Sequence, residues 1–369
     1  MPAACWAASS AATTNNVRRG GRADPAAYTG ALFFLVSALN FLPACLAIVA
    51  ALVGASVAAA DKPSNPIFVL NSLDASISVI DTASFTELRR IPTGKEPHHL
   101  LPTPDGKSLI VANALGDSLT LVDPKTGEVQ RTVTPVSNPY QLRFSPDMKW
   151  LAVAASRLDR VDIYRWQPDD TAAPLKLAGG VRAARKPSHL AIDSQSSTVY
   201  ASLQDSDELI AIDLLTRKPR WKISTGRLPA DVYLTPDDRL LLVALTGDEH
   251  VEVYDLSQPT PNRVKRIQTG AGAHVFRARG DGRHVFVSNR VANTVSLIDT
   301  QSLSVVASYP APGGPDGIDL MADGKTLLVS ARWANKLNVI DIDKKQLVRQ
   351  IDVGRSPHGV WTLDHAARR

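Results

Sequence analysis

The histidines of this 369-residue chain are unevenly placed. Five of the eight fall in four short segments, "PHHL", "PSHL", "GAHV" and "PHGV", each of which leads into an apolar run. The four segments are separated by about twice a 42-residue interval, so they are expected at equivalent points of a repeated unit. These five residues are His98, His99, His189, His274 and His358.

Histidine at such recurring positions points first to metal chemistry. Neutral imidazole is a common metal ligand, and three or four rings around a narrow channel can hold zinc, copper or haem iron. His98, His274 and His358 are the ligand candidates. The alternative is a polar channel lining, hydrogen-bonded to backbone and water. No cofactor is predicted outright, and a covalent c-type haem is excluded because the chain has no C-x-x-C-H motif.

Other polar residues occupy the same or adjoining positions and predict a ligand-binding face at the channel mouth. Arginine beside an aromatic ring can hold a carboxylate, a phosphate or stacked bases. Acidic residues share the same loops, so a solvated rim is favoured over a nucleic-acid site, and the partner is left as an unidentified small molecule or protein. The candidates that complete this set are Tyr140, Asp231, Asp316, Arg157, Arg290, Arg332 and Trp333.

A hydrolytic function is a further alternative. A lactonase needs an acid–base pair near the channel, and His98 or His358 with Asp316 or Asp231 can supply one. The sequence contains no G-x-S-x-G elbow, no H-E-x-x-H pair and no phosphate-binding loop. No catalytic residue is therefore assigned, and binding is favoured over catalysis.

A repeat of about 42 residues must position these side chains. Apolar segments begin at 67, 109, 151, 199, 241, 285 and 327, and an Asp follows about fourteen residues later in six of the seven copies. Turn signals such as "PDGK" (104–107) separate the apolar segments, which alternate polar and apolar residues. Each copy predicts four antiparallel strands, and the conserved spacing of the Asp predicts that it closes the third hairpin. Such units form the blades of a propeller.

The repeat count predicts how the ring closes. Six full blades run from Pro97 to about Asp352, and a seventh begins at His358 with one strand, "HGVWTL". Its other three strands are expected at the opposite end of the repeat region, at 67–91. The fold class is therefore all-β: a seven-bladed β-propeller whose ring is closed by three N-terminal strands plus one C-terminal strand.

This repeat resembles that of the YVTN-repeat β-propellers, which include the YncE-like periplasmic proteins. The segment "GPDGIDLMADGKTLLVSARWANKLNVIDIDKKQLVRQIDVG" (314–354) carries the resemblance, which extends over about 67–363. The resemblance implies the seven-bladed fold. It leaves function open, because the relatives include ligand binders, lactonase-like hydrolases, and propellers of haem d1 and copper enzymes.

The first sixty residues differ in composition from the rest. Arg18, Arg19 and Arg22 precede an apolar run over 31–53, and Ala58–Ala60 supply an A-x-A site. This order predicts a signal peptide (1–60) that is cleaved after Ala60 and a propeller domain (61–369). The mature protein is then expected in the periplasm or outside the cell, without stable insertion into a membrane. A retained anchor is the alternative. Both cysteines lie before the cleavage point, and the mature net charge of +3 gives no argument for an acidic partner.

Overall fold

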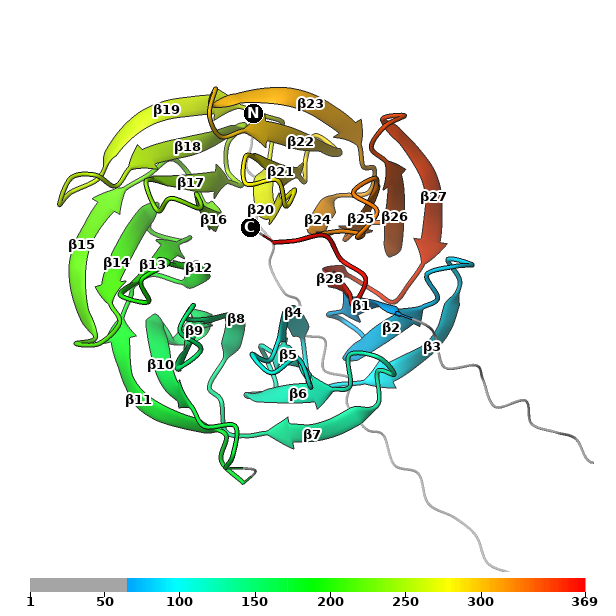
Figure 1. Ribbon diagram of the computed structural model, residues 1–369, viewed down its shortest axis with the longest axis horizontal. Helices are drawn as coiled ribbons and strands as arrows, with labels where there is room; N and C mark the ends of the chain where they lie inside the picture. Colours follow the sequence, from blue (N-terminus) through cyan, green and yellow to red (C-terminus); the bar gives the residue numbers. More distant parts are fainter. Residues whose placement is uncertain (1–64, 171, 369) are drawn as a thin grey trace, which may run out of the picture. The chain divides into compact units, whose positions relative to one another are not determined.

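The computed structural model describes residues 65–170 and 172–368, so the predicted signal peptide and its cleavage point lie outside the described residues. Twenty-eight strands form seven four-stranded antiparallel sheets arranged as blades around a central axis (Figure 1). Only one short 3₁₀ helix, η1 (Ser156–Leu158), interrupts the strands of the described part. Within these ranges no helix is long and apolar enough to cross a bilayer. The predicted all-β, seven-bladed fold is confirmed.

The innermost strand of each blade lies next to the axis, and its first residue is proline in every blade except that of β20, which begins with Ala273. Proline suits this position because the first residue of a strand need not donate a ladder hydrogen bond. The inner strands are β4 (Pro97–Pro102), β8 (Pro139–Phe144), β12 (Pro187–Ile192), β16 (Pro229–Leu234), β20 (Ala273–Ala278), β24 (Pro315–Leu320) and β28 (Pro357–Thr362).

The second and third strands form the buried middle of each blade. Almost every residue of the second strands is buried on both faces, which explains why they read as continuous apolar runs. The second strands are β1 (Ile67–Asn71), β5 (Leu109–Asn113), β9 (Trp150–Ala155), β13 (Thr198–Leu203), β17 (Leu240–Leu245), β21 (His284–Asn289) and β25 (Thr326–Ala331). The third strands are β2 (Ser76–Ile80), β6 (Ser118–Val122), β10 (Arg160–Trp166), β14 (Glu208–Asp213), β18 (His250–Asp255), β22 (Thr294–Asp299) and β26 (Lys336–Asp341).

The fourth strands form the outer wall and are mostly exposed. The recurring Asp at the end of the third strand closes the hairpin that leads to them. Asp123 Oδ1, for example, accepts from the amides of Lys125 and Thr126 at 2.7 and 2.9 Å. The predicted structural role of this Asp is therefore confirmed. The outer strands are β3 (Glu87–Pro92), β7 (Val129–Val133), β11 (Leu175–Arg182), β15 (Lys218–Ser224), β19 (Asn262–Gln268), β23 (Ser304–Pro310) and β27 (Gln346–Asp352).

Seven apolar clusters hold the blades together, one at each interface between neighbouring blades. No blade has a core of its own, because its two faces are covered only by its neighbours. Burial of these clusters therefore stabilises the ring as a whole rather than any single blade.

The ring closes as the repeat count predicts. In the mixed blade, made of β28, β1, β2 and β3, the strand β28 pairs with β1, placing Trp361 opposite Phe68 and Val360 opposite Val69. The two aromatic rings stack with their centroids 6.0 Å apart. Figure 1 shows the red β28 beside the blue β1.

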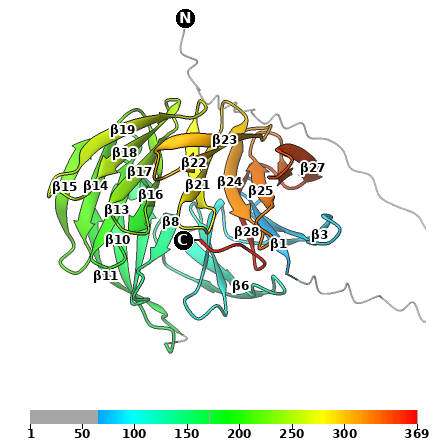
Figure 2. The same cartoon turned by 45° about the horizontal axis from the view of Figure 1, so that its top comes forward.

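Two faces of the ring are distinguished below. The start face is the one on which the inner strands begin, and it also carries the loops between second and third strands, such as 114–117, whose amides bond to residues 95 and 96. The end face is the one on which the inner strands finish, and the segment 363–368 crosses it (Figure 2). In that segment His365 forms an isolated β-bridge with Met321. The amide of Ala366 donates a hydrogen bond to the carbonyl of Leu320 at 2.8 Å.

Candidate metal centre in the propeller channel

The five recurring histidines converge in the channel. They occupy the first two positions after the leading residue of β4, β12, β20 and β28, so the ring architecture directs them toward one another (Figure 1). His98, His189, His274 and His358 are each no more than 2% exposed, and His99 is half-buried. The structure therefore brings these five residues together near the axis of the ring.

The imidazole rings form a continuous arc. Ring centroids lie 3.6 Å apart for His98 and His358, 5.1 Å for His99 and His189, and 5.5 Å for His189 and His274. The ring of Tyr140 joins the arc 3.9 Å from that of His98. The five imidazoles and the Tyr140 ring therefore form one closely packed cluster.

Hydrogen bonds outside the arc orient several of the rings. Nδ1 of His99 lies 2.8 Å from the carbonyl oxygen of Tyr140, which can only accept, so this nitrogen carries a proton. Nδ1 of His274 lies 2.9 Å from Oγ1 of Thr246, whose own proton goes to the carbonyl of Ala273 at 3.0 Å. With the hydroxyl proton on this carbonyl, His274 donates from Nδ1 to Thr246, which leaves a lone pair on Nε2.

Asp316 completes the cluster from β24. Its Oδ1 lies 3.5 Å from Nε2 of His274 and 3.3 Å from Nε2 of His358, and it has no hydrogen-bond partner. Its Oδ2 accepts from Arg290 and, at 3.2 Å, from Nη1 of Arg332. The two arginines therefore fix the carboxylate so that its free oxygen faces the two imidazoles.

The charge states of these groups follow from burial and from one another. Burial lowers the pKa of His98, His189, His274 and His358 well below the usual value, and it lowers that of His99 to about 4. The five rings are consequently neutral at pH 7.

Asp316 behaves in the opposite way. Burial would raise the pKa of its carboxyl, but the positive charges of Arg290 and Arg332 hold it well below its usual range. The Nε2 lone pair of His274 and the ionised Oδ1 of Asp316 are thus two acceptors that face each other, and neither has a hydrogen-bond partner; Nε2 of His358, 3.3 Å from Oδ1, is the neighbouring nitrogen that can donate to the carboxylate when it carries the ring proton. Buried acceptors need a partner, and a cation is the partner that satisfies both.

The spacing of these atoms fits a transition-metal ion. Two ligand atoms bound to a tetrahedral ion at about 2.0 Å lie roughly 3.3 Å apart. The distances of 3.3 and 3.5 Å from Asp316 Oδ1 to the two Nε2 atoms match this value. His274, Asp316 and His358 form one candidate ligand group, and His98, His99 and His358 form another, with all ligand atoms of each group within 4.8 Å of one another.

The first group fits an ion better than the second. Both of its imidazole Nε2 atoms and the carboxylate Oδ1 lack partners, whereas Nδ1 of His98 and Nδ1 of His99 already lie 2.9 Å apart in a shared hydrogen bond. The first group also supplies a negative charge, which offsets that of a bound cation. The metal candidates from the sequence, His98, His274 and His358, thus divide between two groups that share His358.

For three of the predicted site residues, the structure shows partners or positions outside the histidine cluster. Asp231 is buried, but its carboxylate accepts from the amides of Val232 and Phe276 at 3.0 and 2.8 Å. Arg157 pairs with Glu96 on the rim at 2.9 Å, and Trp333 is 59% exposed on the rim. By contrast, Tyr140, Arg290 and Arg332 join the histidine cluster, as the sequence pattern predicts.

Sequence reasoning missed a second group of polar residues, which lies near the end face. Arg143, Arg277 and Asp319 occupy late positions of β8, β20 and β24, and Arg368 follows in the crossing segment. Charged residues inside otherwise apolar inner strands, as in "QLRF" and "HVFRA", were the available signal.

Fold and site together define a seven-bladed propeller with a histidine-lined channel. The sequence profile of the YNCE-like beta-propeller family matches residues 24–368. The chain therefore belongs to the YncE-like β-propeller family.

Solved structures with the same architecture share little sequence with this chain. The periplasmic gluconolactonase PpgL of Pseudomonas aeruginosa aligns with a TM-score of 0.68 at 20% identity, covering 81% of this chain and 98% of that one. A putative 6-phosphogluconolactonase of Bacteroides uniformis aligns with a TM-score of 0.64 at 16% identity, covering 81% and 100%. The dihydro-heme d1 dehydrogenase NirN aligns with a TM-score of 0.58 at 16% identity, covering 81% and 75%. At these identities the likeness establishes the fold alone. No curated protein matches the sequence.

Proposed function

We propose that this YncE-like propeller is a metal-binding protein that holds one transition-metal ion in its channel, with His274, Asp316 and His358 as ligands. The observation that carries the proposal is a set of three buried atoms without hydrogen-bond partners, namely two imidazole Nε2 atoms and one carboxylate oxygen. Two imidazoles and a carboxylate suit Zn²⁺, Fe²⁺, Cu²⁺ or Ni²⁺ rather than Mg²⁺ or Ca²⁺.

The surroundings support an ion rather than a haem. Neighbouring imidazole rings lie 3.6 to 6.4 Å apart, which leaves no gap between neighbours wide enough for a macrocycle. Thr246 orients His274, and Arg290 and Arg332 orient Asp316, as outer hydrogen-bond partners orient ligands in known metal sites. Three protein ligands also leave a coordination position open.

Elemental analysis tests this proposal. The protein, purified without a polyhistidine tag and reconstituted with each of the four ions, is expected to retain close to one equivalent of at least one ion after gel filtration. Asp316→Asn keeps the shape of the side chain but removes its charge, and it is expected to weaken binding by about tenfold to a hundredfold because a carboxylate ligand becomes a neutral amide. His284→Gln, a surface histidine bonded to Asp281, serves as the matched control. Substoichiometric binding of every ion, or equal loss in the control, contradicts the proposal.

Lactone hydrolysis is the second candidate function. It is favoured by the neutral His358 and His98 beside the ionised Asp316, since a neutral imidazole can act as a general base. Two of the similar structures bear lactonase names. Hydrolysis of gluconolactone and 6-phosphogluconolactone above the rate of a His98→Gln/His358→Gln variant supports this candidate, and equal rates exclude it.

We also propose that the protein acts after export. The proposal rests on the basic, apolar and small-residue order of residues 1–60. Intact-mass measurement of the protein recovered from a periplasmic fraction tests it, with a mature chain starting at residue 61 as the expected result.

A further inference from the structure

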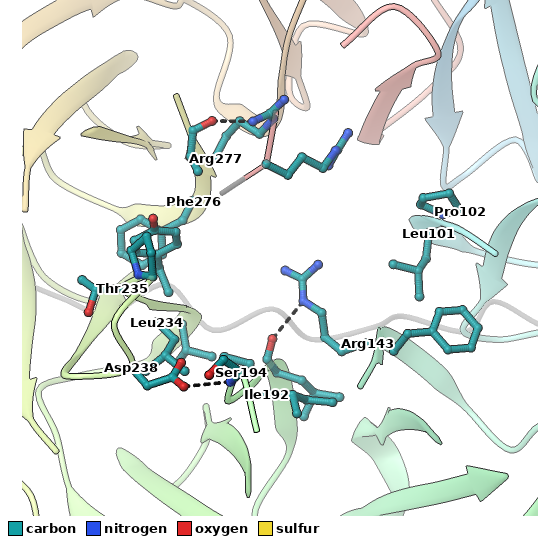
Figure 3. Close-up of a pocket in the computed structure, with 18 of the residues that line it drawn as sticks. Leu101, Pro102, Arg143, Ile192, Ser194, Leu234, Thr235, Asp238, Phe276 and Arg277 are labelled. Atoms are coloured by element: carbon teal, nitrogen blue, oxygen red, sulfur yellow. Dashed lines mark hydrogen bonds between the residues drawn. The ribbon is translucent and has the colours of Figure 1, made fainter. Parts of the chain in front are cut away.

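A second cavity lies near the end face, away from the residues of the channel cluster. Its volume is about 540 Å³, and its wall includes the finishing ends of β4, β8, β12, β16 and β20 together with Arg368 of the crossing segment. Figure 3 shows Arg143 and Arg277 on opposite sides of it. Most of the remaining wall is apolar or aromatic and includes Leu101, Phe144, Ile192, Leu234 and Phe276.

Arg143 is the arginine of this cavity whose guanidinium has the most free hydrogen-bond donors. Its Nε donates to the carbonyl of Leu190 at 3.0 Å, while Nη1 and Nη2 have no hydrogen-bonded protein partner among residues 65–170 and 172–368. The guanidinium extends from β8 into the open space (Figure 3). Burial lowers the pKa of Arg143, and Arg368 lowers it further, so the two cations repel each other across the cavity.

Arg277 has a different role, because its guanidinium is fully engaged. Nε donates to Asp319 at 2.8 Å, Nη2 to the carbonyl of Ala366 at 2.7 Å and Nη1 to that of Ala367 at 2.9 Å. This side chain therefore fastens the crossing segment to the ring. The fastening places Arg368, whose Nη2 donates to Asp319 at 2.8 Å, at the edge of the cavity.

The charges of the wall define what the cavity attracts. Three arginines and one carboxylate, Asp238, line it, and Asp319 behind the wall neutralises part of the positive charge. Asp231, behind Arg143, offsets part of the charge of that side chain. The three carboxylates balance the three arginines in number, so the positive charge is only local, at the free Nη atoms of Arg143, and this suits a single negative charge better than a dianion. A planar guanidinium with two free donors matches a carboxylate, which it can bind through two parallel hydrogen bonds.

We infer that this end-face cavity binds a small organic monocarboxylate, with its carboxylate on Arg143 and its apolar body against the aromatic and aliphatic wall. Neither lactone hydrolysis nor the proposed metal ion uses these residues, so the inference stands independently of the channel. A mostly apolar pocket with a few converging polar groups is the usual form of a small-molecule site.

Calorimetric titration with benzoate and with hexanoate tests the inference, using full-length mature protein in EDTA so that channel metal has no influence. Saturable binding of at least one probe is expected. Benzamide, the neutral analogue of benzoate, is expected to bind at least about tenfold more weakly, because a hydrogen bond to a charged group is lost. Inorganic phosphate is expected to bind more weakly than the carboxylates.

Two variants locate the binding. Arg143→Gln is expected to lower benzoate affinity by about tenfold to a hundredfold. Arg368→Gln, in the crossing segment, is expected to lower it by a smaller factor without disturbing the inner strands. Arg182→Gln, on outer strand β11, is the matched control and should bind as the parent does. If Arg143→Gln fails to fold, as judged by its melting curve, Arg368→Gln carries the test. Absence of saturable binding of both probes up to 10 mM, equal binding of benzamide, or unchanged affinity in the foldable variants overturns the inference.

Discussion

The buried imidazoles make the stability of the metal-free ring depend on pH in a way that can be worked out. In the folded protein, burial holds the pKa of the five channel histidines below the usual value, to about 4 for His99. In the unfolded chain each titrates near 6.5. The unfolded state therefore binds more protons as the pH falls below about 6.5, and the free energy of unfolding must fall with it.

The magnitude follows from the same values. Lowering the pH from 7.5 to 5.5 costs about 1.4 kcal/mol for each imidazole that is protonated only in the unfolded chain. Five such rings together cost up to about 7 kcal/mol, which is comparable to the whole stability of an ordinary domain. Asp316 does not contribute in this interval, because the lowered pKa of a carboxyl affects stability only near and below its unfolded value of about 3.8.

Equilibrium unfolding in urea at several pH values, with EDTA present, measures this dependence. His189→Gln removes one titrating ring and is expected to reduce the fall in stability by about 1.4 kcal/mol over the same interval. Stability that stays constant between pH 7.5 and 5.5, or an unchanged slope in the variant, would show that the rings are charged or solvated in the folded protein. The reasoning about the channel would then be wrong.

Three further predictions concern the ring. Trp361→Ala removes a 2% exposed ring from the closing strand and is expected to cost about 3 to 5 kcal/mol, measured by urea unfolding, whereas the exposed Trp333→Ala should cost less than about 0.5 kcal/mol. Gly317→Ala places a Cβ 2.2 Å from the carbonyl oxygen of His358, so it is expected to move β24 away from β28. Both the metal affinity and the free energy of unfolding are expected to fall, and an unchanged affinity in metal titration would contradict this. Glu252→Gln removes the buried charge that accepts from the half-exposed Arg263 and Arg266, with an expected loss of about 1 to 2 kcal/mol in the same unfolding assay, since solvent screens the arginines; a loss no larger than that of an exposed pair would argue against this network.

The sequence sufficed for the fold because each blade repeats the same local signals. The Asp after the third strand, the turn before the second strand and the apolar strands recur at nearly constant intervals, and the single strand at 357–362 requires the three at 67–92. Register follows from the repeat, so even the closure could be predicted. The apolar faces of each blade pack against its two neighbours, so contacts between distant blades are not needed to predict the fold.

The site was less accessible to sequence reasoning. The histidines could be assigned to one channel, since equivalent positions of inner strands must meet near the axis. The sequence could not show which atoms of these side chains face one another. That arrangement depends on hydrogen bonds such as the one between Thr246 and His274, which lie 28 residues apart. Asp231 illustrates the limit: it occupies a channel position, yet its carboxylate accepts from the amide of Val232 on its own strand and from that of Phe276 on the next inner strand.

The mixed blade also sets the order in which the molecule can be completed during synthesis. A ribosome makes β1 first and β28 only after six intervening blades, so β1 has no partner on its inner edge until nearly 300 further residues exist. Throughout that time β1 presents an open, apolar strand edge, the kind of surface that chaperones shield. An incomplete chain is thus chemically distinguishable from a finished one by that edge, and quality-control factors that recognise extended apolar segments would bind the former and release the latter.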